Sequence, residues 1–161
     1  MSISELTHSQ VVHPFLRAVI DIFQNKTGLD IKPGTPFLKA SKPPSSGELM
    51  AMFNVSAPQL TAVVTICFMK AALRSMLMVN TDTVLKSEIE ELVTIARELV
   101  EIATPILDEK FKAKTLVVPS LLQGQSVNMK IVSNAPTIVV PLTSRRGDFH
   151  IEIVAEKLPT A

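Results

Sequence analysis

Residues 83–107, TVLKSEIEELVTIARELVEIATPIL, have the pattern of one long amphipathic helix, and the rest of the chain is interpreted around them. Apolar residues recur there at alternating spacings of four and three, which places them on one side of a helix. They are Leu85, Ile89, Leu92, Ala96, Leu99, Ala103 and Ile106. Five further apolar residues widen this face to roughly half of the helix circumference: Val93, Ile95, Val100, Ile102 and Leu107. The pattern predicts that this face is buried against a core while the opposite face meets solvent.

The outward face of this helix carries a stripe of polar residues. Residues three and four positions apart are neighbours on a helix, so polar side chains at those spacings line up. The polar stripe consists of Ser87, Glu91, Thr94 and Glu98. A solvated acidic surface is the ordinary interpretation, because most surface helices have one. Other parts of the chain must show whether the stripe is a site.

The composition is that of a single globular domain. The chain has 161 residues, 47% of them hydrophobic and 19% charged, which allows a substantial core. Sixteen Lys and Arg residues against 15 Asp and Glu residues give a formal net charge of +1, so no overall field attracts nucleic acid. The sequence contains neither Trp nor Tyr for base stacking. We therefore expect one domain over residues 1–161 and no nucleic-acid partner.

The sequence gives no sign of export or of membrane insertion. Its first ten residues, MSISELTHSQ, lack the basic start and apolar segment of a secretion signal. No uncharged apolar run approaches the ~20 residues that span a bilayer. The single cysteine, Cys67, cannot form an internal disulfide and lies in the apolar run AVVTICF, so a buried thiol is expected. These observations favour a cytoplasmic protein with no membrane partner.

The remaining chain alternates between helical and extended patterns. Helical spacing is found in residues 11–26 and 69–78. Extended patterns occupy residues 29–32, 36–39, 47–55, 60–68, 115–122, 127–132, 136–142 and 149–155. Pro119 favours an edge position for its strand. This order predicts an α+β fold: a largely antiparallel sheet with helices packed on one face.

Several common catalytic and cofactor-binding patterns are absent. The chain has no GxGxxG or Walker-type loop for a nucleotide and no G-x-S-x-G nucleophile turn. His8, His13 and His150 have no metal-ligand spacing to one another or to Cys67. We therefore expect neither a metal site nor a cofactor belonging to this chain.

Five segments, in their order and spacing, resemble the CheX family, a branch of the CheC/CheX/FliY chemotaxis phosphatases. They are HPFLRAVIDIFQNKTGLDIKPGTPFLK (13–39), SSGELMAMFNVSA (45–57), QLTAVVTICF (59–68), VPSLLQGQSVNM (118–129) and IVVPLTSRRGDFHIEIV (138–154). The resemblance covers nearly the whole chain. It implies a CheX-like domain whose partner is a phosphorylated response regulator of the CheY type.

The family's catalytic signature falls on the polar stripe. It consists of Asp or Ser, Glu four residues later, Asn three residues beyond, and a Pro farther downstream. The matching residues here are Ser87, Glu91, Thr94 and Pro119. The resemblance implies that Ser87, Glu91 and Glu98 contact the regulator and that Glu91 pairs with its active-site Lys. It also implies that the Mg²⁺ of the reaction is carried by the partner.

Thr94 departs from the signature, which has Asn at this position. A carboxamide donates and accepts hydrogen bonds at once, whereas the hydroxyl of Thr is shorter and its side chain is β-branched. The resemblance therefore implies an aspartyl-phosphate phosphatase, with Glu91 and Thr94 as catalytic residues, whose activity is weak. Two other readings stay open: a module that binds the regulator without catalysis, and a structural role in which the stripe is only solvated.

The family resemblance also predicts a homodimer. CheX-like domains pair through sheet edges, and the short extended segments between residues 29 and 39 could supply such an edge.

Overall fold

The computed structural model has a helix, four strands, two helices and three strands in its described residues, in the order that the sequence patterns predict. The structure describes residues 13–39, 48–58, 60–77, 88–112, 114–123 and 137–157. The helices in these ranges are α2 (His13–Thr27), α3 (Lys70–Leu77) and α4 (Glu88–Phe111). The strands are β1 (Lys32–Pro33), β2 (Phe37–Lys39), β3 (Leu49–Ala57), β4 (Leu60–Phe68), β5 (Leu116–Gln123), β6 (Thr137–Ser144) and β7 (Gly147–Lys157).

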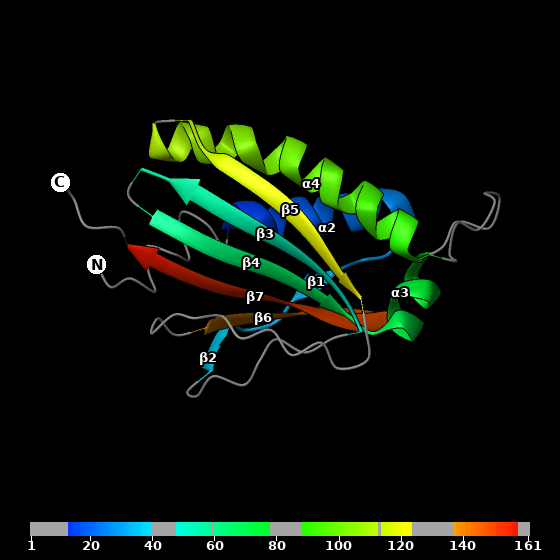
Figure 1. Ribbon diagram of the computed structural model, residues 1–161. Coiled ribbons are helices and arrows are strands. Elements are labelled where there is room, and N and C mark those ends of the chain that lie inside the picture. The colour runs from blue at the N-terminus through cyan, green and yellow to red at the C-terminus, as the bar shows by residue number, and fades with distance from the viewer. Residues whose placement is uncertain are drawn as a thin grey trace.

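The strands form one antiparallel sheet in the order β1-β6-β7-β4-β3-β5, and β2 also pairs with β6. β5 therefore lies at one edge of the sheet, and β1 and β2 lie at the other. α4 and α2 run side by side over one face, and α3 lies at one end (Figure 1). The predicted α+β fold, with helices on one face of an antiparallel sheet, is confirmed.

Strand alternation explains how the sheet builds this core. Ala51, Ile66, Ile151 and Val140 are cross-strand neighbours on β3, β4, β7 and β6, so their side chains form one row on the helix-covered face. All four are fully buried. Phe149, Ile151 and Ile153, which alternate along β7, belong to the same core.

Three phenylalanines join α2 to the sheet. The ring centroid of Phe149 lies 5.1 Å from that of Phe23 and 4.8 Å from that of Phe68. These separations are typical of favourable aromatic pairs. α2 ends at Thr27, and the following Gly28 adopts a left-handed conformation (φ +70°) while its N–H donates to the carbonyl of Gln24 at 2.9 Å. Gly28 therefore ends α2, two residues beyond the helical pattern predicted for residues 11–26.

The fully buried face of α4 is narrower than the predicted one, because Val93 and Val100 are only half-buried and Ile102 is exposed. The fully buried residues are Leu92, Ile95, Ala96, Leu99, Ala103 and Leu107, whereas Ile106 is only half-buried. The predicted positions follow a period of 3.5 residues, and a straight helix of period 3.6 drifts by ~20° per heptad. The face therefore passes from the Ile106 side to Leu107.

Several element boundaries differ from the sequence prediction. α4 continues beyond Leu107 to Phe111, and Lys112 follows in a left-handed conformation (φ 52°). β3 extends to Ala57, which pairs with Leu60, so the turn is shorter than residues 56–59. The predicted beginning of α4 at residues 83–87 and the predicted strand at 127–132 lie outside the described residues. Within the described part of the chain, no helix is long and apolar enough to cross a bilayer.

Truncating a buried leucine of α4 should weaken the fold far more than truncating an exposed one. Leu99→Ala removes a fully buried side chain and should lower the free energy of unfolding by ~2–5 kcal/mol. Leu116→Ala, on the exposed surface of β5, should stay within ~0.5 kcal/mol. Urea unfolding followed by circular dichroism measures both. Equal, small losses would contradict the packing of α4 described above.

Candidate functional site

The polar stripe lies on the outer side of α4, opposite its buried leucines. Glu91, Thr94 and Glu98 are all half-buried, and they follow one another along successive turns. Ser87 lies outside the described residues. The structure therefore brings together three of the four predicted positions on a single helix, as their spacing requires.

Glu98 is engaged by the neighbouring helix. Its Oε1 lies 3.0 Å from the Nζ of Lys26 on α2, near the contact between the two helices. A partly exposed pair of this kind contributes at most ~1 kcal/mol to folding. A partner that binds Glu98 would therefore displace Lys26 at little cost.

Thr94 turns its hydroxyl toward its own helix. The Oγ1–H donates a hydrogen bond of 3.1 Å to the carbonyl of Glu90, one turn earlier. This local bond is a common habit of Thr inside helices. It uses the only donor that Thr94 has, so the hydroxyl offers an incoming molecule only acceptor capacity.

Glu91 differs from Glu98 in having no such neighbour. Its carboxylate forms no ion pair within the described part of the chain. A half-buried carboxylate on an outer helix face is suited to meet a cation supplied by another molecule.

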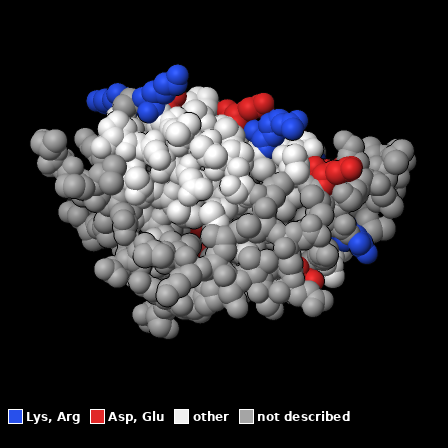
Figure 2. All heavy atoms as spheres, in the orientation of Figure 1, with Lys and Arg blue, Asp and Glu red and all other residues white. Residues whose placement is uncertain are grey.

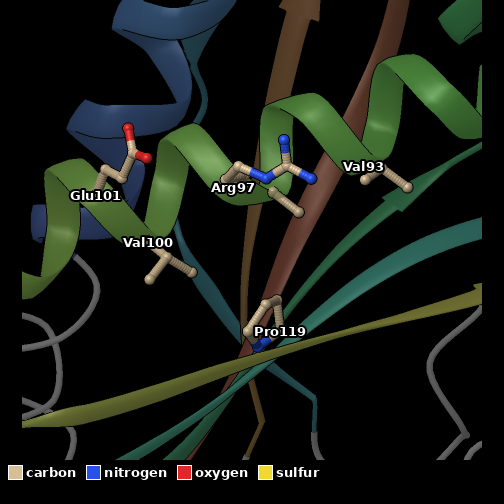
Figure 3. Close-up of a pocket in the computed structure, with 6 residues that line it drawn as sticks. Val93, Arg97, Val100, Glu101 and Pro119 are labelled. Atoms are coloured by element: carbon tan, nitrogen blue, oxygen red, sulfur yellow. The ribbon is translucent and has the colours of Figure 1, made fainter.

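A hollow of about 460 Å³ lies between α4 and the edge strand β5. Its described lining consists of Val93, Ala96, Arg97, Val100, Glu101 and Pro119. Figure 3 shows the Pro119 ring pointing from β5 toward α4, while the Glu101 carboxylate points away from it. Asp108 holds the two elements together, because its Oδ1 accepts a 2.6 Å hydrogen bond from the backbone N–H of Thr115.

This hollow contains residues that the sequence analysis did not select. Pro119 belongs to the predicted signature, but its partners in the described lining are Arg97 and the two valines rather than residues of the polar stripe. Glu98 contacts α2, whereas Arg97 lines the hollow on the β5 side of α4, because consecutive helix residues project about 100° apart. Arg97 follows Thr94 by three residues and precedes Glu101 by four. These spacings place Thr94, Arg97 and Glu101 in a second polar row on the helix, and this row could have been recognised from the sequence.

The surface beside the helix is largely uncharged. Figure 2 shows Lys, Arg, Asp and Glu gathered along the edge formed by α4, with an uncharged area below it over β5. Leu116 and Val118 are exposed apolar side chains of that strand. A charged helix above an apolar strand is the usual composition of a protein-binding surface, with polar groups around an apolar centre.

Solved structures identify this architecture, although no protein-family model and no curated protein matches the sequence. A CheC-like superfamily protein from Shewanella sp. PV-4 is 21% identical, with a TM-score of 0.74 over 97% of this chain and 99% of that chain. The chemotaxis protein CheX from Desulfovibrio desulfuricans is 19% identical, with a TM-score of 0.72 over 90% and 98%. This chain has the CheC/CheX fold.

A third structure with the CheC/CheX fold was crystallised with a partner. It is the CheX–CheY–BeF3–Mg²⁺ complex from Borrelia burgdorferi, whose matching chain is 21% identical, with a TM-score of 0.59 over 90% of this chain and 97% of that chain. Identities this low establish the fold alone. What the CheC/CheX fold does in this protein must be argued from its own residues, above all Glu91 and Thr94.

The described residues of the polar stripe hold no cluster of metal ligands. Across the described part of the chain, the one such cluster lies elsewhere in the CheC/CheX fold, on the sheet, and consists of Cys67, His150 and Glu152. Cys67 and His150 have no metal-ligand spacing in the sequence. The antiparallel pairing of β4 with β7 makes them direct cross-strand neighbours.

Proposed function

We propose that this protein binds a phosphorylated response regulator of the CheY type through the outer face of α4 and hydrolyses its aspartyl phosphate slowly. The observation that carries the proposal is the Glu91 carboxylate, half-buried on this face and without an ion-pair partner in the described chain. It lies one helical turn from Thr94 in a fold shared with a crystallised CheX–CheY complex.

Glu91 supplies recognition in this proposal. The carboxylate pairs with the active-site Lys of the regulator, as the family resemblance implies, and the contact excludes water from both groups. Such charge-assisted pairs are short and directional, so they fix the register of the two proteins. The hollow beside Arg97 and Pro119 has no residue of the polar stripe in its described lining, so the proposed contact of Glu91 does not depend on it.

Thr94 supplies water positioning. A water molecule attacks the phosphorus in line with the aspartyl oxygen, the P–O bond to the carboxyl breaks, and inorganic phosphate leaves. This reaction depends mainly on positioning and on electrostatic stabilisation. The Mg²⁺ belongs to the regulator, and the proposal gives this chain no cofactor of its own. It also includes a cytoplasmic location, where such a regulator is phosphorylated.

A second candidate function is binding without catalysis. The hydrogen bond from the Thr94 hydroxyl to the Glu90 carbonyl favours it, because the hydroxyl then cannot donate to the water or to the phosphoryl group. The decay of a ³²P-labelled regulator, with and without this protein, distinguishes the two functions. Faster decay supports the phosphatase, whereas unchanged decay together with phosphorylation-dependent binding supports the adaptor.

Replacing Glu91 should weaken binding of the phosphorylated regulator. Glu91→Ala removes one member of a desolvated charge pair, at a cost of ~2–5 kcal/mol, or roughly 30-fold or more in Kd. Glu109→Ala, an exposed carboxylate on the last turns of the same helix, is the matched control and should change Kd less than about twofold. Isothermal titration calorimetry measures both. Equal losses of affinity in the two variants would show that only the overall negative charge of the helix contributes to binding.

Restoring the family carboxamide should raise activity. Thr94→Asn places a donor and an acceptor where the hydroxyl is committed to the helix, and Thr and Asn have similar helix propensity. We expect phosphate release from the regulator to accelerate ~10-fold or more, a change of ~1.4 kcal/mol in the barrier, with Kd little changed.

Thr94→Val, which removes the hydroxyl at nearly constant volume, is the control for this substitution. It should retain binding and show no more activity than the wild-type protein. A wild-type protein already as fast as the Asn variant would refute the assignment of weak positioning to Thr94.

We further propose that the protein forms a homodimer through its β2 edge. Phe37 and Leu38 on this strand are 52% and 53% exposed, and a short apolar edge strand is a template for pairing. Light scattering at roughly tens of micromolar, a concentration far above the Kd of a tight dimer, should give the dimer mass. Leu38→Lys should give a monomer, while Leu116→Lys, at the opposite edge, should leave the dimer intact. A monomeric wild-type protein would exclude this assembly.

A further inference from the structure

The sheet face away from the helices holds a buried polar cluster that the proposed regulator site does not use. Thr65 and Cys67 on β4 are 1% and 2% exposed, and Glu152 on β7 is 1% exposed. Met50 and Val154 on the same face are buried as well. Buried carboxylates are stabilised by hydrogen bonds, by opposite charges or by metal ions, so the groups around Glu152 are informative.

Strand register brings three ligating side chains together at this point. Cys67 pairs with His150, and Thr65 pairs with Glu152, so all four side chains lie on one face. The Oε2 of Glu152 lies 3.2 Å from the Nε2 of His150 and accepts a hydrogen bond of 3.4 Å from the Sγ of Cys67. The three ligand atoms all lie within 4.8 Å of one another.

Thr65 adds an independent observation. Its Oγ1 is buried and has no hydrogen-bond partner among the described residues. Such groups are uncommon in native proteins, and each one suggests an unseen ligand or water. Thr65 stands directly across from Glu152 and two residues from Cys67, on the face where the three ligand atoms converge.

We propose that Cys67, His150 and Glu152 bind one divalent transition-metal ion of the Zn²⁺ class. A thiolate, an imidazole and a carboxylate are ligands that Zn²⁺ takes, at bond lengths of about 2.0–2.3 Å. Tetrahedral geometry then separates the donor atoms by roughly 3.3–3.6 Å, close to the 3.2 and 3.4 Å found here. Mg²⁺ and Ca²⁺ prefer oxygen donors throughout, so the thiol and the imidazole select against them.

The charges of the three ligands and the exposure of His150 both favour binding of a divalent ion. The Cys67 thiol loses its proton to solvent on binding, so a thiolate, a carboxylate and a neutral imidazole surround a charge of +2 and give a neutral buried unit. The fourth ligand is a water molecule, which provides the missing partner of the Thr65 hydroxyl. The side chain of His150 is 29% exposed, and this gives the ion a path from solvent.

Cobalt(II) is the direct probe of this site, because Cys67 is the only cysteine in the chain. Reduced, chelator-treated full-length protein should bind one equivalent of Co²⁺. A thiolate-to-metal charge-transfer band in the near ultraviolet should appear, and Zn²⁺ should abolish it while Mg²⁺ leaves it unchanged. No band, or binding that never saturates at one equivalent, would overturn the proposal.

Variants assign the ligands. Cys67→Ser should remove the charge-transfer band, and His150→Gln and Glu152→Gln should each weaken Co²⁺ binding at least tenfold. His13→Gln, an exposed histidine on α2, is the matched control and should bind as the wild-type protein does. Unchanged affinity in all three ligand variants would refute the assignment.

The wild-type protein provides a second test if a variant fails to fold. Zn²⁺ should slow alkylation of Cys67 by N-ethylmaleimide at least tenfold in mild urea, whereas Mg²⁺ should have no effect. Equal alkylation rates with the two ions would also overturn the proposal.

Discussion

The burial of one face of α4 is the contact on which the proposed regulator-binding surface depends. Leu92, Ile95 and Leu99 are fully buried, and each contributes ~1.5–3 kcal/mol by leaving water. Contacts on the outer side, such as the pair between Lys26 and Glu98, contribute at most ~1 kcal/mol. The core therefore fixes the rotation of α4 about its axis, and this rotation determines the direction in which the polar stripe points.

Local patterns predicted the elements well where a single physical rule dominates. β4 has the predicted bounds, because a continuous β-rich run followed by helical spacing leaves little choice. Pro119 predicted the edge position of β5 for a similar reason, since proline cannot donate to a second neighbour. The error at Ile106 arose from counting in heptads along a straight helix, where the buried face drifts.

Tertiary proximity was beyond the same reasoning. Arg97 and Pro119 line one hollow only because β5 packs against α4, and no spacing in either segment encodes that packing. Cys67 and His150 meet only because β4 and β7 pair in one particular register. A shift of one residue would send His150 to the opposite face, so its contact with Glu152 depends on the whole sheet. The hydrogen bond from the Thr94 hydroxyl to the Glu90 carbonyl depends on the side-chain rotamer, which the sequence does not specify.

Pro119 has a consequence for how the chain avoids misassembly. An edge strand normally presents an uninterrupted row of amide and carbonyl groups, to which a partly folded neighbour can add. The proline interrupts that row near the middle of β5, the longer of the two edges. A strand from another molecule could not form a continuous set of backbone hydrogen bonds with β5, which disfavours aggregation into fibres at high concentration. β2 carries no proline and is only three residues long, so any pairing along it stops after a few bonds.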